Sequence, residues 1–129
     1  QIANDFNLDL ILLIAPTTPL GRMKVISSRT KGFSYLVSVT GVTGERNKLE
    51  NRVESLIGQL KEISHNPIAV GFGISSPDHI IKVRKWGADG VIIGSAFVKR
   101  ISDSKDSQIV DELGKFCSVM RSAADEILE

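Results

Sequence analysis

The sequence predicts a parallel α/β fold in one domain, because short apolar runs alternate with longer stretches that have helical spacing. Four such strand–helix units follow one another along the chain. The first apolar run is continuous rather than alternating, which is typical of a strand buried on both faces. This order favours a parallel sheet joined by right-handed crossovers.

Each predicted strand ends at a proline, a glycine or a polar loop. The four expected strands cover residues 10–15, 32–38, 68–70 and 90–93. The first is the longest apolar run of the chain, and it is far shorter than the roughly 20 residues that a membrane-spanning helix needs.

Helices are expected after each strand. Thr18 and Ser76 each precede a proline and are expected to cap a helix that begins at that proline, where a missing N–H costs nothing. The expected helices cover 20–28, 49–63 with one apolar stripe, 77–86, a short turn around 98–101 and 108–128; 102–107 is expected to be a polar loop.

Composition excludes several classes of function. A net charge of +1 on 129 residues makes nucleic acid and acidic membranes poor candidates as partners. The single cysteine, Cys117, rules out an internal disulfide and a cysteine-built zinc site, and it fits a reducing compartment. Cys117 is expected in the core, and His65 and His79 are expected to be solvated or capping.

Two glycine-rich turns are the strongest indication of function. Gly71 and Gly73 follow the third strand, and Gly94 and Ser95 follow the fourth and open a short helix. Ligands bind at the carboxyl ends of parallel strands, and glycine amides at a helix N-terminus suit a phosphate. The alternative is that these glycines only permit tight turns.

A second feature is the long polar stretch 39–48, between the second strand and its helix. It exceeds the usual length of such a connection, so it is either a lid over a substrate or a plain surface loop.

Four segments carry motifs in a distinctive order and spacing: 12–19, 32–44, 71–77 and 90–99. They include Gly-Val-Thr-Gly at 41–44 and Gly-Phe-Gly-Ile-Ser at 71–75. In these segments the chain resembles the alpha subunits of tryptophan synthase, and the combination of the two motifs is quite specific to that family.

The resemblance implies a TIM (β/α)₈ barrel, of which this chain would be the C-terminal (β/α)₄ half, strands five to eight. The family cleaves indole-3-glycerol phosphate to indole and glyceraldehyde 3-phosphate in tryptophan biosynthesis. Its partner is a beta subunit that uses pyridoxal phosphate, whereas no metal or organic cofactor is implied for this chain. The expected location is the cytoplasm or a plastid stroma.

Site residues carry over from the family one by one. Backbone amides of the phosphate turns would hold the phosphate, Phe72 would lie near the indole, Tyr35 beside the substrate, and Thr43 would be the lid threonine that bonds a catalytic aspartate. The expected substrate- and phosphate-binding residues are Gly44, Gly71, Phe72, Gly73, Gly94 and Ser95.

The chain departs from the family in its acids. The reaction needs a general acid and a general base, and the family's glutamate and aspartate on the second strand and its loop have no counterpart here. Asp9 and Asp89 precede strands, at the wrong end of the barrel, and only Glu45 lies on the correct side. The chain is therefore expected to be inactive alone.

Half a barrel leaves alternatives open for architecture and function. The chain is a fragment, a half-barrel that pairs with itself, or a small open sheet with helices on both sides. The alternative functions are another phosphate-binding barrel enzyme and a non-catalytic half-barrel that binds a partner.

Overall fold

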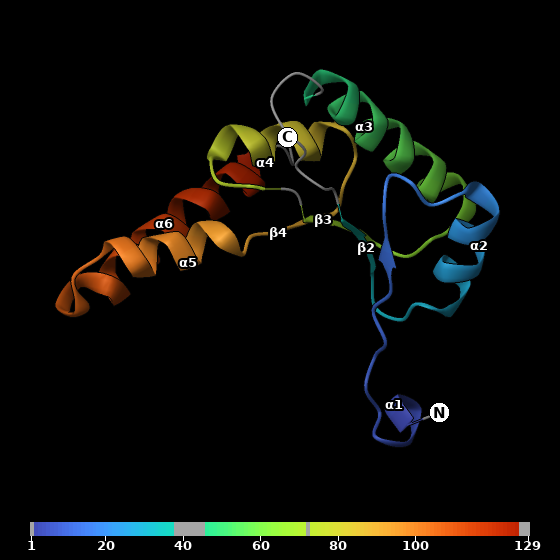
Figure 1. The fold of residues 1–129 in the computed structure, drawn as a ribbon, viewed down its shortest axis with the longest axis horizontal. Coiled ribbons are helices and arrows are strands. Elements are labelled where there is room, and N and C mark those ends of the chain that lie inside the picture. Colours follow the sequence, from blue (N-terminus) through green and yellow to red (C-terminus); the bar gives the residue numbers. More distant parts are fainter. Residues whose placement is uncertain (1, 38–45, 72, 127–129) are drawn as a thin grey trace.

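The computed structural model describes residues 2–37, 46–71 and 73–126 (Figure 1). The strands are β1 (Leu13–Ile14), β2 (Ser34–Val37), β3 (Ile68–Gly71) and β4 (Gly90–Ile92). The helices are α1 (Ile2–Asp5), α2 (Leu20–Arg29), α3 (Arg46–Ile63), α4 (Pro77–Lys85), α5 (Ser95–Asp103) and α6 (Ile109–Asp125), with a 3-10 turn at Asp106–Gln108.

The four strands form one parallel sheet in the order β1-β2-β3-β4. Every strand pairs with its neighbour in sequence, so right-handed crossovers carry the connecting helices to the same face of the sheet. Figure 1 shows α2, α3 and α4 along that outer side. This is the (β/α)₄ half-barrel predicted from the sequence, and it excludes a sheet with helices on both sides.

The core lies between the sheet and these helices. Alternate strand residues point into it and are buried, and apolar residues of α3 and α4 meet them. The core includes Ile14, Leu36, Ile68 and Val70 from the strands and Val53, Ile57, Leu60, Ile80 and Val83 from the helices. The apolar stripe predicted for 49–63 is confirmed over Val53, Leu56, Ile57 and Leu60.

The other face of the sheet is open, so the prediction of a first strand buried on both faces is wrong. Ile14 is fully buried, whereas Leu13 keeps 56% of its surface exposed. Tyr35 and Ala69 lie on the same open face and are partly exposed. A continuous apolar run is typical of a strand with apolar neighbours on both faces. The described residues cover only the face of β1 that includes Ile14.

Neither Thr18 nor Ser76 caps its helix with a side-chain hydrogen bond, although both were expected to be caps. Thr18 does not cap α2: its hydroxyl accepts a hydrogen bond from the Ala15 amide at 3.0 Å, and Pro19 takes the N-cap position. Ser76 does occupy the N-cap of α4 with Pro77 next to it, but its side chain makes no capping hydrogen bond. The Thr18 side chain thus bonds the backbone that follows β1 instead of the first turn of α2.

Several boundaries also move. Helix α3 begins at Arg46, so the end of the polar stretch 39–48 is helical, and α5 runs on to Asp103 into the expected polar loop. Strand β1 has only two residues, and the short α1 was not predicted.

Cys117 is exposed, which corrects its expected place in the core. The buried face of α6 is formed by Phe116, Met120 and Ala123, whose spacing of four and three residues leaves Cys117 to one side. The Phe116 ring packs edge-on against Phe97 of α5, with ring centroids 4.9 Å apart. This contact holds α5 against α6 just after β4.

Candidate functional site

The carboxyl ends of β2, β3 and β4 lie side by side. Val37 is opposite Gly71 in the register, and Gly71 is in turn opposite Ile92. The chain segments that follow β3 and β4 therefore leave the sheet at the same edge. Residues 73 and 94, from two turns about 20 residues apart in sequence, belong to this one edge.

Tyr35 and Gly71, both predicted site residues, are in close contact on the open face. A Cβ built on Gly71 would lie 2.8 Å from Cζ of Tyr35 and closer still to its hydroxyl oxygen. Real Cβ atoms do not approach this closely, so only glycine lets the ring lie across β3. The ring of Tyr35 is thus placed by the absence of a side chain on the neighbouring strand.

We expect Gly71→Ala to displace the Tyr35 ring from β3, because ring and Cβ cannot occupy the same space. The amide and ring signals of Tyr35 in NMR spectra should shift strongly, and the free energy of unfolding should fall by about 1–3 kcal/mol. Gly90→Ala is the matched control on β4, where a Cβ would meet only the Ala69 Cβ at 3.9 Å. Unchanged Tyr35 signals in Gly71→Ala would contradict this packing.

Three observations describe residues 73–75 of the turn after β3. Gly73 has φ of +45°, in the left-handed region that favours glycine, and Ile74 next to it is buried. The Ser75 amide donates a hydrogen bond to Nδ1 of His79 at 3.3 Å, which ties the turn to the first turn of α4. His79 thus holds a loop amide, in line with the capping role expected for it.

Gly94 and Ser95 form the start of α5. The Gly94 carbonyl accepts hydrogen bonds from the amides of Phe97 and Val98, at 2.9 and 3.2 Å. The amides of Ser95 and Ala96 precede them in the first turn, where helix amides lack intrahelical partners. A Cβ at Gly94 would meet nothing within 4 Å, so the space beside this helix start is open.

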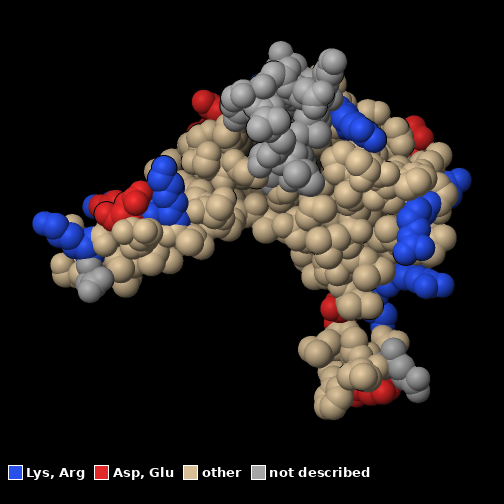
Figure 2. Space-filling model, in the orientation of Figure 1, with Lys and Arg blue, Asp and Glu red and all other residues tan. Residues whose placement is uncertain are grey.

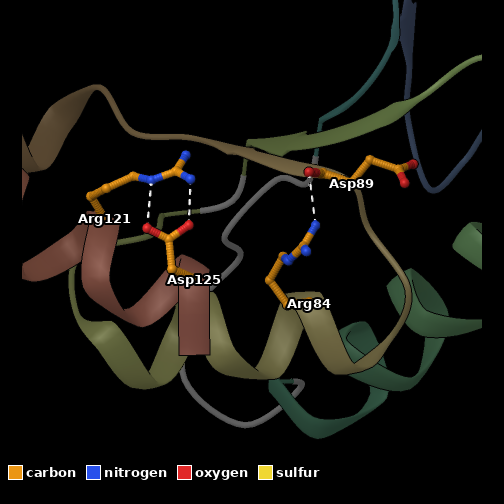
Figure 3. A network of polar contacts seen from close by, with 4 residues as sticks. All are labelled: Arg84, Asp89, Arg121 and Asp125. Atoms are coloured by element: carbon orange, nitrogen blue, oxygen red, sulfur yellow. Dashed lines mark hydrogen bonds and ion pairs between the residues drawn. The ribbon is translucent and has the colours of Figure 1, made fainter. Parts of the chain in front are cut away.

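Asp89 lies at the other end of the strands. Asp89 accepts a hydrogen bond from the Ile68 amide at 2.9 Å, where β3 begins, and Arg84 donates to the carbonyl oxygens of Ala88 and Asp89. Figure 3 shows the contact of Arg84 with the Asp89 carbonyl oxygen and, near it, the ion pair of Arg121 with Asp125. The prediction that Asp89 lies at the amino-terminal end is confirmed, so it is not placed for acid–base chemistry at the glycine turns.

Some predicted site residues lie outside the described ranges. They are Thr43, Gly44, Glu45, Phe72 and most of the stretch 39–48. Within the described ranges, no three histidine, cysteine or acidic side chains come together as a metal site. No helix of the described part is both long and apolar enough to cross a membrane.

The sequence reasoning missed how two residues support the turn after β3: it did not place Ile74 in the core, and it expected His79 to be solvated or capping without naming the turn that it bonds. Ile74 anchors the β3 turn in the core, and His79 bonds its backbone. An apolar residue between a glycine and two serines was a usable signal for the first. The second depends on a side-chain orientation that spacing does not reveal.

Comparison with known proteins gives consistent matches over nearly the whole chain. The family model described as "Tryptophan synthase alpha chain" matches residues 1–125. A tryptophan synthase alpha chain from Prochlorococcus marinus subsp. pastoris is 71% identical over 98% of this chain and 45% of its own length. One from Synechococcus sp. strain CC9902 is 56% identical over 96% of this chain and 46% of its own.

Solved structures agree with the sequence matches. A mutant tryptophan synthase alpha-subunit from Pyrococcus furiosus superimposes with a TM-score of 0.80 at 37% identity, over 94% of this chain and 48% of that one. A structure of the tryptophan synthase α2β2 complex from the same organism gives a TM-score of 0.78 at 36% identity, over 94% and 47%. The chain thus spans about half the length of the relatives it matches.

Proposed function

The chain belongs to the tryptophan synthase alpha chain family, and on that premise we propose that it forms the phosphate-binding half of an indole-3-glycerol-phosphate lyase. The products of the reaction would be indole and glyceraldehyde 3-phosphate. The family assignment favours this function over that of another phosphate-binding barrel enzyme.

One observation carries the proposal: the two glycine turns lie at one sheet edge, and the second opens α5. The amides of Gly73, Gly94 and Ser95 would donate to the phosphate oxygens. The positive end of the α5 dipole would add to the attraction. Gly44 and Phe72 complete the proposed set by resemblance.

The proposed reaction breaks the carbon–carbon bond between indole C3 and the glyceryl chain. A general acid protonates indole C3. A general base takes the proton of the hydroxyl on the glyceryl carbon bonded to C3, and that carbon becomes the aldehyde carbon as the bond breaks. The contribution of this chain would be to hold the phosphate and, with Tyr35, to fix the substrate at the strand ends. Thr43 would support the catalytic aspartate from the lid, and both carboxylates would come from the half of the barrel that this chain does not include.

The proposed protein partner is a tryptophan synthase beta subunit. A structural relative forms an α2β2 complex, and the resemblance places the contact on the loops of the catalytic face. The proposed location is the bacterial cytoplasm, since the relatives named above come from Prochlorococcus and Synechococcus.

Gly94→Ala tests the phosphate site without disturbing the fold. A methyl group at this position points into open space, so it would stand where the phosphate must approach. We expect calorimetric titration with glycerol 3-phosphate to show binding to the parent chain at least about tenfold tighter than to the variant, a loss of roughly 1.4 kcal/mol.

The matched control is Gly114→Ala in α6, where a Cβ also meets nothing within 4 Å. This variant should bind glycerol 3-phosphate as the parent chain does. If Gly94→Ala binds glycerol 3-phosphate as tightly as the parent chain and keeps its circular dichroism spectrum, the phosphate does not bind at this turn.

A further inference from the structure

Helix α5 depends on its neighbours to keep its shape. It has nine residues, and a helix this short is not stable in water without tertiary contacts. Its first turn includes the Ser95 amide, which lacks an intrahelical partner and is one of the proposed phosphate donors. The side chains that fix this turn therefore bear on how the phosphate is held.

Arg100 of α5 is fixed to α6 through one aromatic ring. Its Cζ lies 3.5 Å from the centroid of the Phe116 ring, and Phe116 is buried. The face of an aromatic ring attracts a guanidinium at this distance. The edge-on contact of Phe97 is made with the same ring, so two side chains of α5 meet a single residue of α6, which runs alongside (Figure 1).

The same guanidinium bonds the backbone in the first turn of α5. Nη1 of Arg100 donates to the Ala96 carbonyl oxygen at 3.2 Å. That carbonyl shares its peptide group with the Phe97 amide, which donates to the Gly94 carbonyl oxygen at 2.9 Å. The Gly94 carbonyl in turn shares its peptide group with the Ser95 amide. A continuous chain of hydrogen bonds thus runs from the Arg100 cation, through two peptide groups, to the Ser95 N–H.

We propose that Arg100 is a positioning residue of the phosphate site, which holds the Ser95 amide in place and makes it a stronger donor. Each hydrogen bond in such a chain polarises the next one, and a cation at one end increases the positive charge on the amide hydrogen at the other. This inference rests on the proposed function, because it assigns Arg100 to the same phosphate.

The general charge of the surface around Arg100 does not supply the same effect. Lys99 and Asp103 line the groove beside it, and Figure 2 shows basic and acidic side chains together on the α5–α6 side of the molecule. Among the described residues, Lys99 has no hydrogen bond or ion pair. Arg100 therefore differs from its neighbour in its contacts with the helix backbone and the Phe116 ring, whereas both carry the same charge.

Three variants test the proposal in the 129-residue chain joined to the preceding part of the Prochlorococcus marinus relative. Arg100→Met removes the charge and the donors but keeps an unbranched side chain that can lie on the Phe116 ring. We expect calorimetric titration to show that it binds glycerol 3-phosphate at least about threefold more weakly, the size of a charge effect at a helix terminus. Lys99→Met removes the same charge one residue away and should bind as the parent protein does. Arg100→Lys restores a donor for the Ala96 carbonyl and should recover most of the affinity.

The amide signals of Phe97 and Ser95 in NMR spectra give a second readout, which needs no ligand. Both amides belong to the peptide groups of the hydrogen-bond chain, so their nitrogen chemical shifts should change in Arg100→Met and stay constant in Lys99→Met. In the cleavage assay, Arg100→Met should raise KM and leave kcat nearly unchanged, because the phosphate is remote from the bond that breaks.

The possible results separate this inference from the proposed function. If Arg100→Met binds glycerol 3-phosphate as tightly as the parent protein, Arg100 has no such role, although the phosphate site itself stands. An equal loss of affinity in Arg100→Lys or in Lys99→Met would also overturn the inference, because packing or general charge would then explain the loss. A parent protein that does not bind glycerol 3-phosphate would overturn the proposed function, and this inference with it.

Discussion

Replacing Leu36 by alanine is expected to have the largest effect on stability of any single change considered. Leu36 is fully buried in β2, in the middle of the sheet, and faces the helices. Deletion of a buried leucine side chain costs about 2–5 kcal/mol, because the cavity that remains relaxes only in part. Since small domains are stable by only about 5–15 kcal/mol, this variant should lose much of its stability.

Urea unfolding followed by circular dichroism measures this difference. The control is Leu20→Ala on α2, where the side chain is 47% exposed and the expected loss is about 1 kcal/mol or less. If the two variants unfold at the same urea concentration, β2 does not lie at the centre of a packed core.

The second large effect concerns turnover. The 129-residue chain alone is expected to release indole from indole-3-glycerol phosphate no faster than buffer does, because the proposed acid and base lie outside it. Joining it to the preceding part of the Prochlorococcus marinus relative, which matches it at 71% identity, should restore cleavage. A positioned acid or base each contributes about 10²–10⁴-fold, so the gain should be at least that large.

A fluorescence assay for released indole follows this reaction. The same chimera with Gly94→Ala should lose activity mainly through weaker substrate binding, seen as a raised KM. Indole release by the chain alone, or a chimera that folds and stays inactive, would show that the catalytic groups are not divided as proposed.

The fold could be predicted because each element carries a local signal. The stripe of Val53, Leu56, Ile57 and Leu60 identifies α3, and Pro77 marks the start of α4. What could not be predicted depends on neighbours distant in sequence. Whether both faces of β1 are covered depends on strands and helices distant in sequence. The residues of β1 themselves do not show whether those elements are present.

The candidate site shows the same division. Glycine in two successive turns indicated where Gly73 and Gly94 lie, because such turns impose local conformations. The contact between Tyr35 and Gly71 depends on the register of β2 against β3, and no local sequence pattern predicts that register. Cys117 was placed wrongly because a residue at the border of a helical stripe packs or stays exposed according to its neighbours.

The most direct test of the account is an amide NMR titration of the chain with glycerol 3-phosphate. The central claim is that the backbone of the two glycine turns holds the phosphate, and the amide signals report on that backbone directly. We expect saturable shifts at Gly73, Gly94 and Ser95, with little change at the α2 arginines. Shifts confined to Arg22 and Arg29, or no shifts at all, would contradict the claim.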